Sequence, residues 1–199
     1  MHISEGVLSP SVLIAGALLA TGGVAIGIRK MDYRRIPEVA VLSSAFFVAS
    51  LIHVPIGPVN AHLILNGLVG ILLGWMAFPS ILVALLLQAL LFQFGGLTTL
   101  GINTLIMAVP AITAYYLFGF LIKKGNHALT VVSGFLAGAT GVGAAGLIVA
   151  LSLLGTGDEF INIIKIVLAA HIPVMLIEGI ITAFCIVFLK RIKPELLGV

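Results

Sequence analysis

Long apolar runs constrain this chain more than any other feature of its sequence. Several stretches approach the ~20 residues that cross the ~30 Å hydrocarbon layer of a bilayer, with glycine and proline between them. The 199 residues are 61% hydrophobic and 9% charged, which leaves too few polar groups to cover a soluble globule. The runs are continuous, without the alternation typical of a membrane β-barrel, so the backbone has to bond within helices. The sequence predicts an all-α integral membrane protein with a single transmembrane domain over residues 1–199.

The apolar runs predict seven transmembrane helices. They cover residues 9–28, 38–54, 61–77, 80–94, 98–122, 128–154 and 160–189. Clusters of lysine and arginine follow the first, fifth and seventh runs, so all three clusters fall on one side of the membrane. That side is cytoplasmic by the positive-inside rule, which places the amino terminus outside and the carboxyl terminus in the cytoplasm. The rule also accounts for the basic balance of the chain without a nucleic-acid partner.

The first two residues, Met1 and His2, form a pattern that can chelate a metal. The terminal amine, the backbone nitrogen of His2 and its Nδ1 can close two fused rings around one cation. Because these donors lie nearly in one plane, the pattern favours Ni(II) or Cu(II) over zinc. On the predicted topology, His62 reaches the same depth and can supply a fourth nitrogen. His53 is the rival, and either histidine can instead be an interfacial residue that is hydrogen-bonded to a carbonyl.

Two ionisable residues, His171 and Glu178, lie seven positions apart in the last run and therefore on one helical face. Ionisable groups inside a membrane are costly, so each is expected to have a partner. We expect a hydrogen bond that joins two helices, with a second metal or proton site as the alternative. Small residues spaced by four, such as Gly134 and Gly138, predict close helix contacts that lie mainly within the bundle.

Three segments together carry a resemblance that covers nearly the whole chain. They read "MHISEG", "NAHLILNGLVGILLGWMAFPSILVALLLQALLFQFGGLTTLGINTLIMAVPA" and "AAHIPVMLIEGIIT". The chain resembles the membrane-embedded substrate-specificity (S) component of energy-coupling-factor nickel and cobalt transporters, the NikM or CbiM family. The resemblance implies a multi-pass protein of a prokaryotic cell (inner) membrane, whose first helix drives the amino terminus into a seven-helix bundle. It also implies that the metal is held by the amine of Met1, the amide and imidazole nitrogens of His2, and His62.

Polar groups near such a metal should also matter. A divalent ion with a neutral amine, one deprotonated amide and two imidazoles keeps about one net positive charge. Candidates that orient the imidazoles or hold the amino-terminal segment are Ser4, Glu5, Asn60, Asn66 and Asn103. For Glu5, a carboxylate that faces the dipole of the first helix is an equal alternative.

The predicted function is capture of Ni(II), with Co(II) as the close alternative, from the outer side for import. The sequence has no glycine-rich phosphate loop and so no ATP site, which means that this chain cannot power transport alone. The resemblance implies cytoplasmic ATPase subunits and a membrane coupling (T) subunit, with a small accessory membrane protein in some systems. In related transporters a small-residue motif contacts the coupling subunit, which makes Ala45 and Ala49 contact candidates.

Two other classes of function are alternatives for this sequence. A proton-coupled secondary transporter that uses His171 and Glu178 would work without ATP. An intramembrane metalloenzyme would need ligands beside an activated water and a general base, and the sequence has no HExxH or comparable pair of histidines. The chain is therefore not predicted to be an enzyme.

Overall fold

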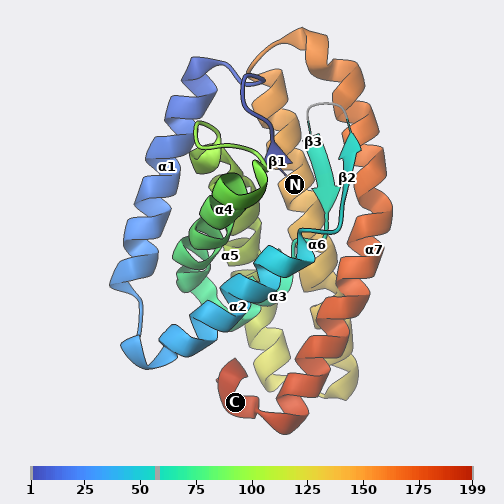
Figure 1. The fold of residues 1–199 in the computed structure, drawn as a ribbon. Coiled ribbons are helices and arrows are strands. Elements are labelled where there is room, and N and C mark those ends of the chain that lie inside the picture. Colours follow the sequence, from blue (N-terminus) through green and yellow to red (C-terminus); the bar gives the residue numbers. More distant parts are fainter. Residues whose placement is uncertain (1, 57–58, 199) are drawn as a thin grey trace.

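The computed structural model describes residues 2–56 and 59–198, apart from the side chains of residues 53–61. In this part of the chain, α-helices form a bundle around a short β-sheet (Figure 1). The helices are α1 (Pro10–Arg29), α2 (Ile36–Ala49), α3 (Asn66–Leu73), α4 (Ala77–Phe92), α5 (Leu100–Lys124), α6 (His127–Leu154) and α7 (Ile161–Ile192). The strands are β1 (His2–Ile3), β2 (His53–Ile56) and β3 (Val59–His62).

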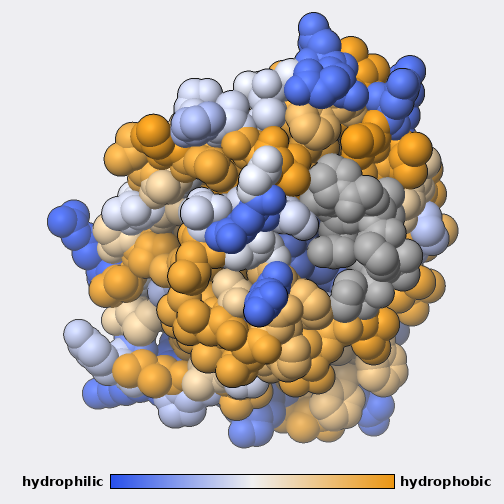
Figure 2. Space-filling view, turned by 45° about the horizontal axis from the view of Figure 1, so that its top comes forward, coloured by the Kyte–Doolittle hydropathy of each residue, from blue (hydrophilic) through white to orange (hydrophobic). Residues whose placement is uncertain are grey.

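Five stretches of the described chain are long and apolar enough to span a membrane. They are Pro10–Arg29, Asn66–Phe92, Leu100–Lys124, His127–Leu154 and Asp158–Ile192. Hydrophobic residues cover much of the face in Figure 2, with hydrophilic residues at its upper right, in its centre and along its left and lower margins. The chain is thus a helical, multi-pass membrane protein, as predicted.

The predicted count of seven spanning helices is not established. The helix α2 has 14 residues, which rise about 21 Å along the axis, less than the ~30 Å hydrocarbon layer. The third and fourth predicted spans together form one candidate stretch, Asn66–Phe92, within which the 3₁₀ turn Gly74–Met76 and the positive φ of Gly74 separate α3 from α4.

Local residues favour the observed starts of α1 and α6. Pro10 occupies the first turn of α1, where its missing N–H costs nothing. The side chain of Asn126 caps α6 by accepting a hydrogen bond from the Leu129 N–H at 2.9 Å. Four predicted spans, the first, fifth, sixth and seventh, agree with α1, α5, α6 and α7 to within three residues at each end.

The chain between α2 and α3 differs from the helical prediction. Two antiparallel strands, β2 and β3, replace the end of the second predicted span and the start of the third. The strand β1 adds to β3, giving the order β1-β3-β2. Pro55 and Pro58 cannot donate the hydrogen bonds that a helix needs, and Pro55 lies in the edge strand β2, where a proline is tolerated. His62 is therefore in a strand rather than in a helix.

Small residues allow the helices to pack closely within the bundle, as predicted. A methyl group on Gly134 would lie 2.9 Å from the Cα atom of Ala183 in α7. A methyl group on Gly138 would collide with the backbone carbonyl of Glu178. The backbones of α6 and α7 therefore touch, and Glu178 is fixed in position by this contact.

Candidate metal-binding site

The amino-terminal strand β1 lies inside the helix bundle (Figure 1). The side chains of His2 and Ile3 are 1% and 0% exposed. In the register of the sheet, His2 pairs with Asn60 and Ile3 with Val59. Met1 lies outside the described residues, but the pairing of β1 fixes where the chain enters the bundle.

The imidazole rings of His2 and His62 lie next to each other. Their centroids are 4.5 Å apart, and their planes are inclined by 28°. His62 is 3% exposed, and the ring of Phe94 lies 6.1 Å from that of His2. Since metal–nitrogen bonds are about 2 Å long, one ion can reach a nitrogen of each histidine ring at this separation. The side chain of His53 lies outside the described residues, although its backbone pairs with that of His62.

A hydrogen bond defines which nitrogen of His62 carries its proton. The Nδ1 of His62 lies 2.7 Å from the carbonyl oxygen of Leu63. A carbonyl oxygen can only accept, so Nδ1 is the donor and the ring lone pair is on Nε2. Metal-bound histidines in proteins usually donate their second ring nitrogen in this way.

Asn103, on α5, holds the residue that follows His2. Its Oδ1 accepts a hydrogen bond from the Ile3 N–H at 2.9 Å, and its Nδ2 donates to the Ile3 carbonyl at 3.1 Å. The same Nδ2 lies 3.1 Å from the hydroxyl of Thr99. A planar amide that bonds both backbone groups of Ile3 leaves β1 little freedom to slide or rotate.

Glu5 fastens the segment after β1 to the loop between α4 and α5. Its Oε1 accepts hydrogen bonds from the Thr98 N–H at 2.8 Å and from the Thr98 hydroxyl at 3.0 Å. The Glu5 N–H donates to the Gly95 carbonyl at 3.0 Å. The two donors of Thr98, the backbone N–H foremost, hold the pKa of Glu5 below its usual value, so the contact is present at neutral pH.

Two glycines in this loop lie against residues of the candidate site, and the sequence did not single them out. Gly95 and Gly96 have φ of +74° and +124°, which L side chains rarely adopt. A methyl group on Gly95 would lie 2.8 Å from Nδ2 of Asn103, and one on Gly96 would collide with the carboxyl group of Glu5. Adjacent glycines directly after an apolar run are a turn signal that could have pointed to this loop.

We expect the substitution Gly96→Ala to weaken metal binding by about 10- to 100-fold, because it disfavours the loop conformation and displaces Glu5. Nickel titration of the purified protein measures the effect. Gly22→Ala is the matched control, since Gly22 is exposed on α1 and an added methyl group there meets nothing within 4 Å. Equal affinities of the two variants would contradict a role of this loop in the site.

The other residues that the sequence nominated lie in several parts of the fold. Asn66 is fully buried at the start of α3 and donates from Nδ2 to the Gly141 carbonyl at 3.1 Å. Ser4 is half-buried next to β1, and the side chain of Asn60 lies outside the described residues. On α2, Ala45 is exposed and Ala49 is partly exposed.

His171 and Glu178 are both buried in α7, but they bond different partners. The Nδ1 of His171 donates to the Val167 carbonyl of its own helix at 2.5 Å. Glu178 accepts from the backbone N–H groups of Ile64 and Leu65, between β3 and α3. In the described part of the chain, no hydrogen bond joins the two side chains.

The comparison with known families decides the class of the protein. A family model described as "Cobalt uptake substrate-specific transmembrane region", CbiM, matches residues 2–196. The chain belongs to the CbiM family. A Haemophilus influenzae protein named for metal transport is 44% identical over 100% of this chain and 97% of its own length. The fused nickel transport protein NikMN of Rhodobacter capsulatus is 32% identical over 100% of this chain and 64% of its own length.

A solved structure supports the same assignment. The crystal structure of a transition metal transporter superposes with a TM-score of 0.80 at 29% identity, covering 98% of this chain and 95% of that one. This CbiM-family protein is therefore a membrane component of cobalt or nickel uptake. It is a transport protein and not an enzyme, as predicted.

Proposed function

We propose that this chain, as a single transmembrane domain, captures Ni(II) for an ATP-driven importer of the energy-coupling-factor type, with Co(II) as the close alternative. The observation that carries the proposal is the buried pair of His2 and His62, placed where β1 brings the amino terminus into the bundle. The amine of Met1, the amide and Nδ1 of His2, and Nε2 of His62 would be the four donors.

The donor chemistry favours nickel. The described residues contain no group of three or more His, Cys, Asp or Glu side chains that could hold an ion. A site built from one terminal nitrogen, one backbone nitrogen and two imidazoles needs no such group of side chains. Four nitrogens in one plane suit Ni(II). A relative of this chain, NikMN of Rhodobacter capsulatus, is named for nickel transport.

The distribution of charge supports capture from outside. The basic clusters follow α1, α5 and α7, and these three helix ends lie at the lower end of the bundle in Figure 1. The acidic residues Asp158 and Glu159 precede α7 at the opposite end. With the basic end in the cytoplasm, the seven helices α1–α7 would place the amino terminus and its metal site toward the outer side.

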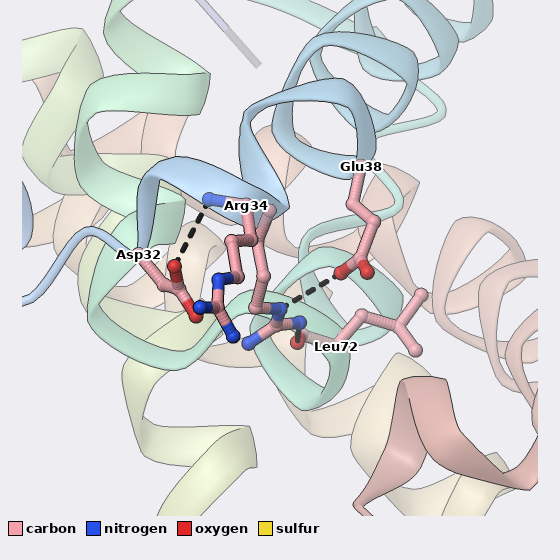
Figure 3. Close-up of polar contacts among 5 residues, drawn as sticks. Asp32, Arg34, Glu38 and Leu72 are labelled. Atoms are coloured by element: carbon pink, nitrogen blue, oxygen red, sulfur yellow. Dashed lines mark hydrogen bonds and ion pairs between the residues drawn. The ribbon is translucent and has the colours of Figure 1, made fainter.

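The start of α2 supports a contact with a coupling subunit. The guanidinium of Arg35 bonds the Glu38 carboxylate through Nε and the Leu72 carbonyl of α3 through a terminal nitrogen, both at 2.8 Å (Figure 3). Asp32 accepts from the Arg34 N–H at 2.9 Å and caps the preceding turn (Figure 3). This fixed helix presents Ala45 on its exposed face, where a membrane T subunit would bind. Cytoplasmic ATPases, and in some systems a small accessory membrane protein, would complete the importer.

Purified untagged protein tests the proposal. We expect one nickel ion per chain at high affinity, and no nickel uptake when this chain alone is reconstituted in liposomes. Uptake driven by a proton gradient would instead support the secondary transporter that relies on His171 and Glu178. If the purified protein binds neither nickel nor cobalt, both the capture component and the secondary metal transporter are ruled out.

A further inference from the structure

We propose that Glu178 is a positioning residue that orients the imidazole of His62 through a single peptide group, an inference that rests on the proposed metal-binding function. The carboxyl group of Glu178 is fully buried, although the residue lies 116 positions from His62 in the sequence. Its partners belong to the short connection between β3 and α3, which directly follows His62.

The contacts of Glu178 converge on this connection. Its Oε1 accepts a hydrogen bond from the Ile64 N–H at 2.5 Å, and the Leu65 N–H lies 2.9 Å from Oε1 and 3.0 Å from Oε2. The backbone of Glu178 packs closely against Gly138 of α6. The carboxyl group is thus a fixed acceptor that two consecutive backbone donors share.

The peptide group between Leu63 and Ile64 joins Glu178 to His62. Its N–H donates to Glu178, while its carbonyl oxygen accepts the hydrogen bond from Nδ1 of His62 at 2.7 Å. Because a peptide group is planar, fixing the N–H also fixes the direction of the carbonyl. Hydrogen bonds in a chain polarise one another, so an acceptor on the N–H strengthens the carbonyl as an acceptor for His62. We call this chain of contacts the Glu178 relay.

The local backbone shows why such an anchor is needed. Leu65 has φ of +53° and lies directly before α3. A left-handed conformation is unfavourable for a leucine and persists only where the surroundings impose it. Without an acceptor for the Ile64 and Leu65 N–H groups, the connection would relax and the His62 ring would lose its fixed orientation and tautomer.

The relay resembles the carboxylate–histidine–metal arrangement of many metal sites, with a peptide group between the carboxylate and the histidine. Loss of such an outer partner typically costs about 10- to 100-fold in metal affinity. We therefore expect Glu178→Leu to raise the nickel Kd by about that factor. Glu178→Gln keeps an acceptor oxygen but not the charge, so we expect a rise of only about 3- to 10-fold.

A control separates this role from general stability. Gln88 of α4 is equally buried and bonds the Ser50 hydroxyl after α2, away from the relay. We expect Gln88→Leu to lower the melting temperature and to leave the nickel Kd within about twofold, since its bond joins two helices and does not reach His62. If Gln88→Leu weakens binding as much as Glu178→Leu does, the positioning role is overturned.

NMR of histidine-labelled, metal-free protein reads the relay directly. In the native protein the His62 nitrogens should show the tautomer protonated at Nδ1, and Glu178→Leu should produce a mixture of tautomers. If that variant does not fold, Glu178→Gln decides, because a weaker acceptor should still shift the Nδ1 signal. Unchanged His62 signals and unchanged Kd in Glu178→Gln overturn the proposal. This readout needs no metal, so native protein that fails to bind nickel would reject the proposed function without deciding the relay.

Discussion

An extension of one residue before Met1 is expected to abolish high-affinity nickel binding. The extension converts the terminal amine into an amide and adds volume where β1 is already buried and paired with β3. The bonds of Asn103 to both backbone groups of Ile3 prevent the strand from shifting to make room. Nickel titration of a protein with a cleavable amino-terminal tag measures the effect, and we expect a loss of more than about 100-fold in affinity, beyond what the loss of an outer partner costs.

Removal of the tag provides the control. Cleavage that restores Met1 as the first residue should recover binding, whereas a tag at the carboxyl terminus should have no effect. The recovered complex should be diamagnetic and yellow-orange, as expected for Ni(II) with four planar nitrogens. An intact extension that binds nickel as tightly as the untagged protein would show that the amine is not a ligand.

The helical part of the fold could be predicted because its signals are local. Continuous apolar runs with few charges define α1, α5, α6 and α7, and Pro10 and the capping residue Asn126 mark the starts of α1 and α6. The same signal is ambiguous over short apolar stretches, where strand and helix have similar composition. The end of the second predicted span and the start of the third, where β2 and β3 form instead, were therefore the part of the fold that was predicted wrongly.

In the candidate site, too, the residues with a local sequence signal could be predicted, and the roles that depend on tertiary contacts could not. His2 could be named from the sequence because an amino-terminal chelate is recognisable as a pattern, whereas residue types left His62 and His53 as rivals until the resemblance favoured His62. The roles of Thr98, Gly95 and Gly96 depend on tertiary contacts with Glu5 and Asn103, which no local pattern contains. Glu178 stood out as an intramembrane carboxylate, but its partners are backbone groups of the connection before α3 rather than another side chain.

The histidines of the sheet give the sharpest test of which side chain completes the site. We expect His62→Ala to raise the nickel Kd by more than about 100-fold, since a directly bound nitrogen should matter more than an outer partner. We expect His53→Ala to leave it within about threefold. The prediction follows from the observed contact of the His62 ring with that of His2 and from the Nδ1 bond that leaves the lone pair on Nε2. Isothermal titration of the two variants measures both values.

His127→Ala controls for the loss of a histidine as such. His127 is exposed at the start of α6, at the end of the bundle that is opposite to the site, so its removal should change neither affinity nor the colour of the complex. Alanine at position 62 leaves the Leu63 carbonyl and the Glu178 contacts in place, so the fold should persist and water should take the fourth position on the metal. A larger loss for His53→Ala than for His62→Ala would move the fourth ligand to β2. In that case the His62 bond to Leu63 would serve only to order the connection between β3 and α3.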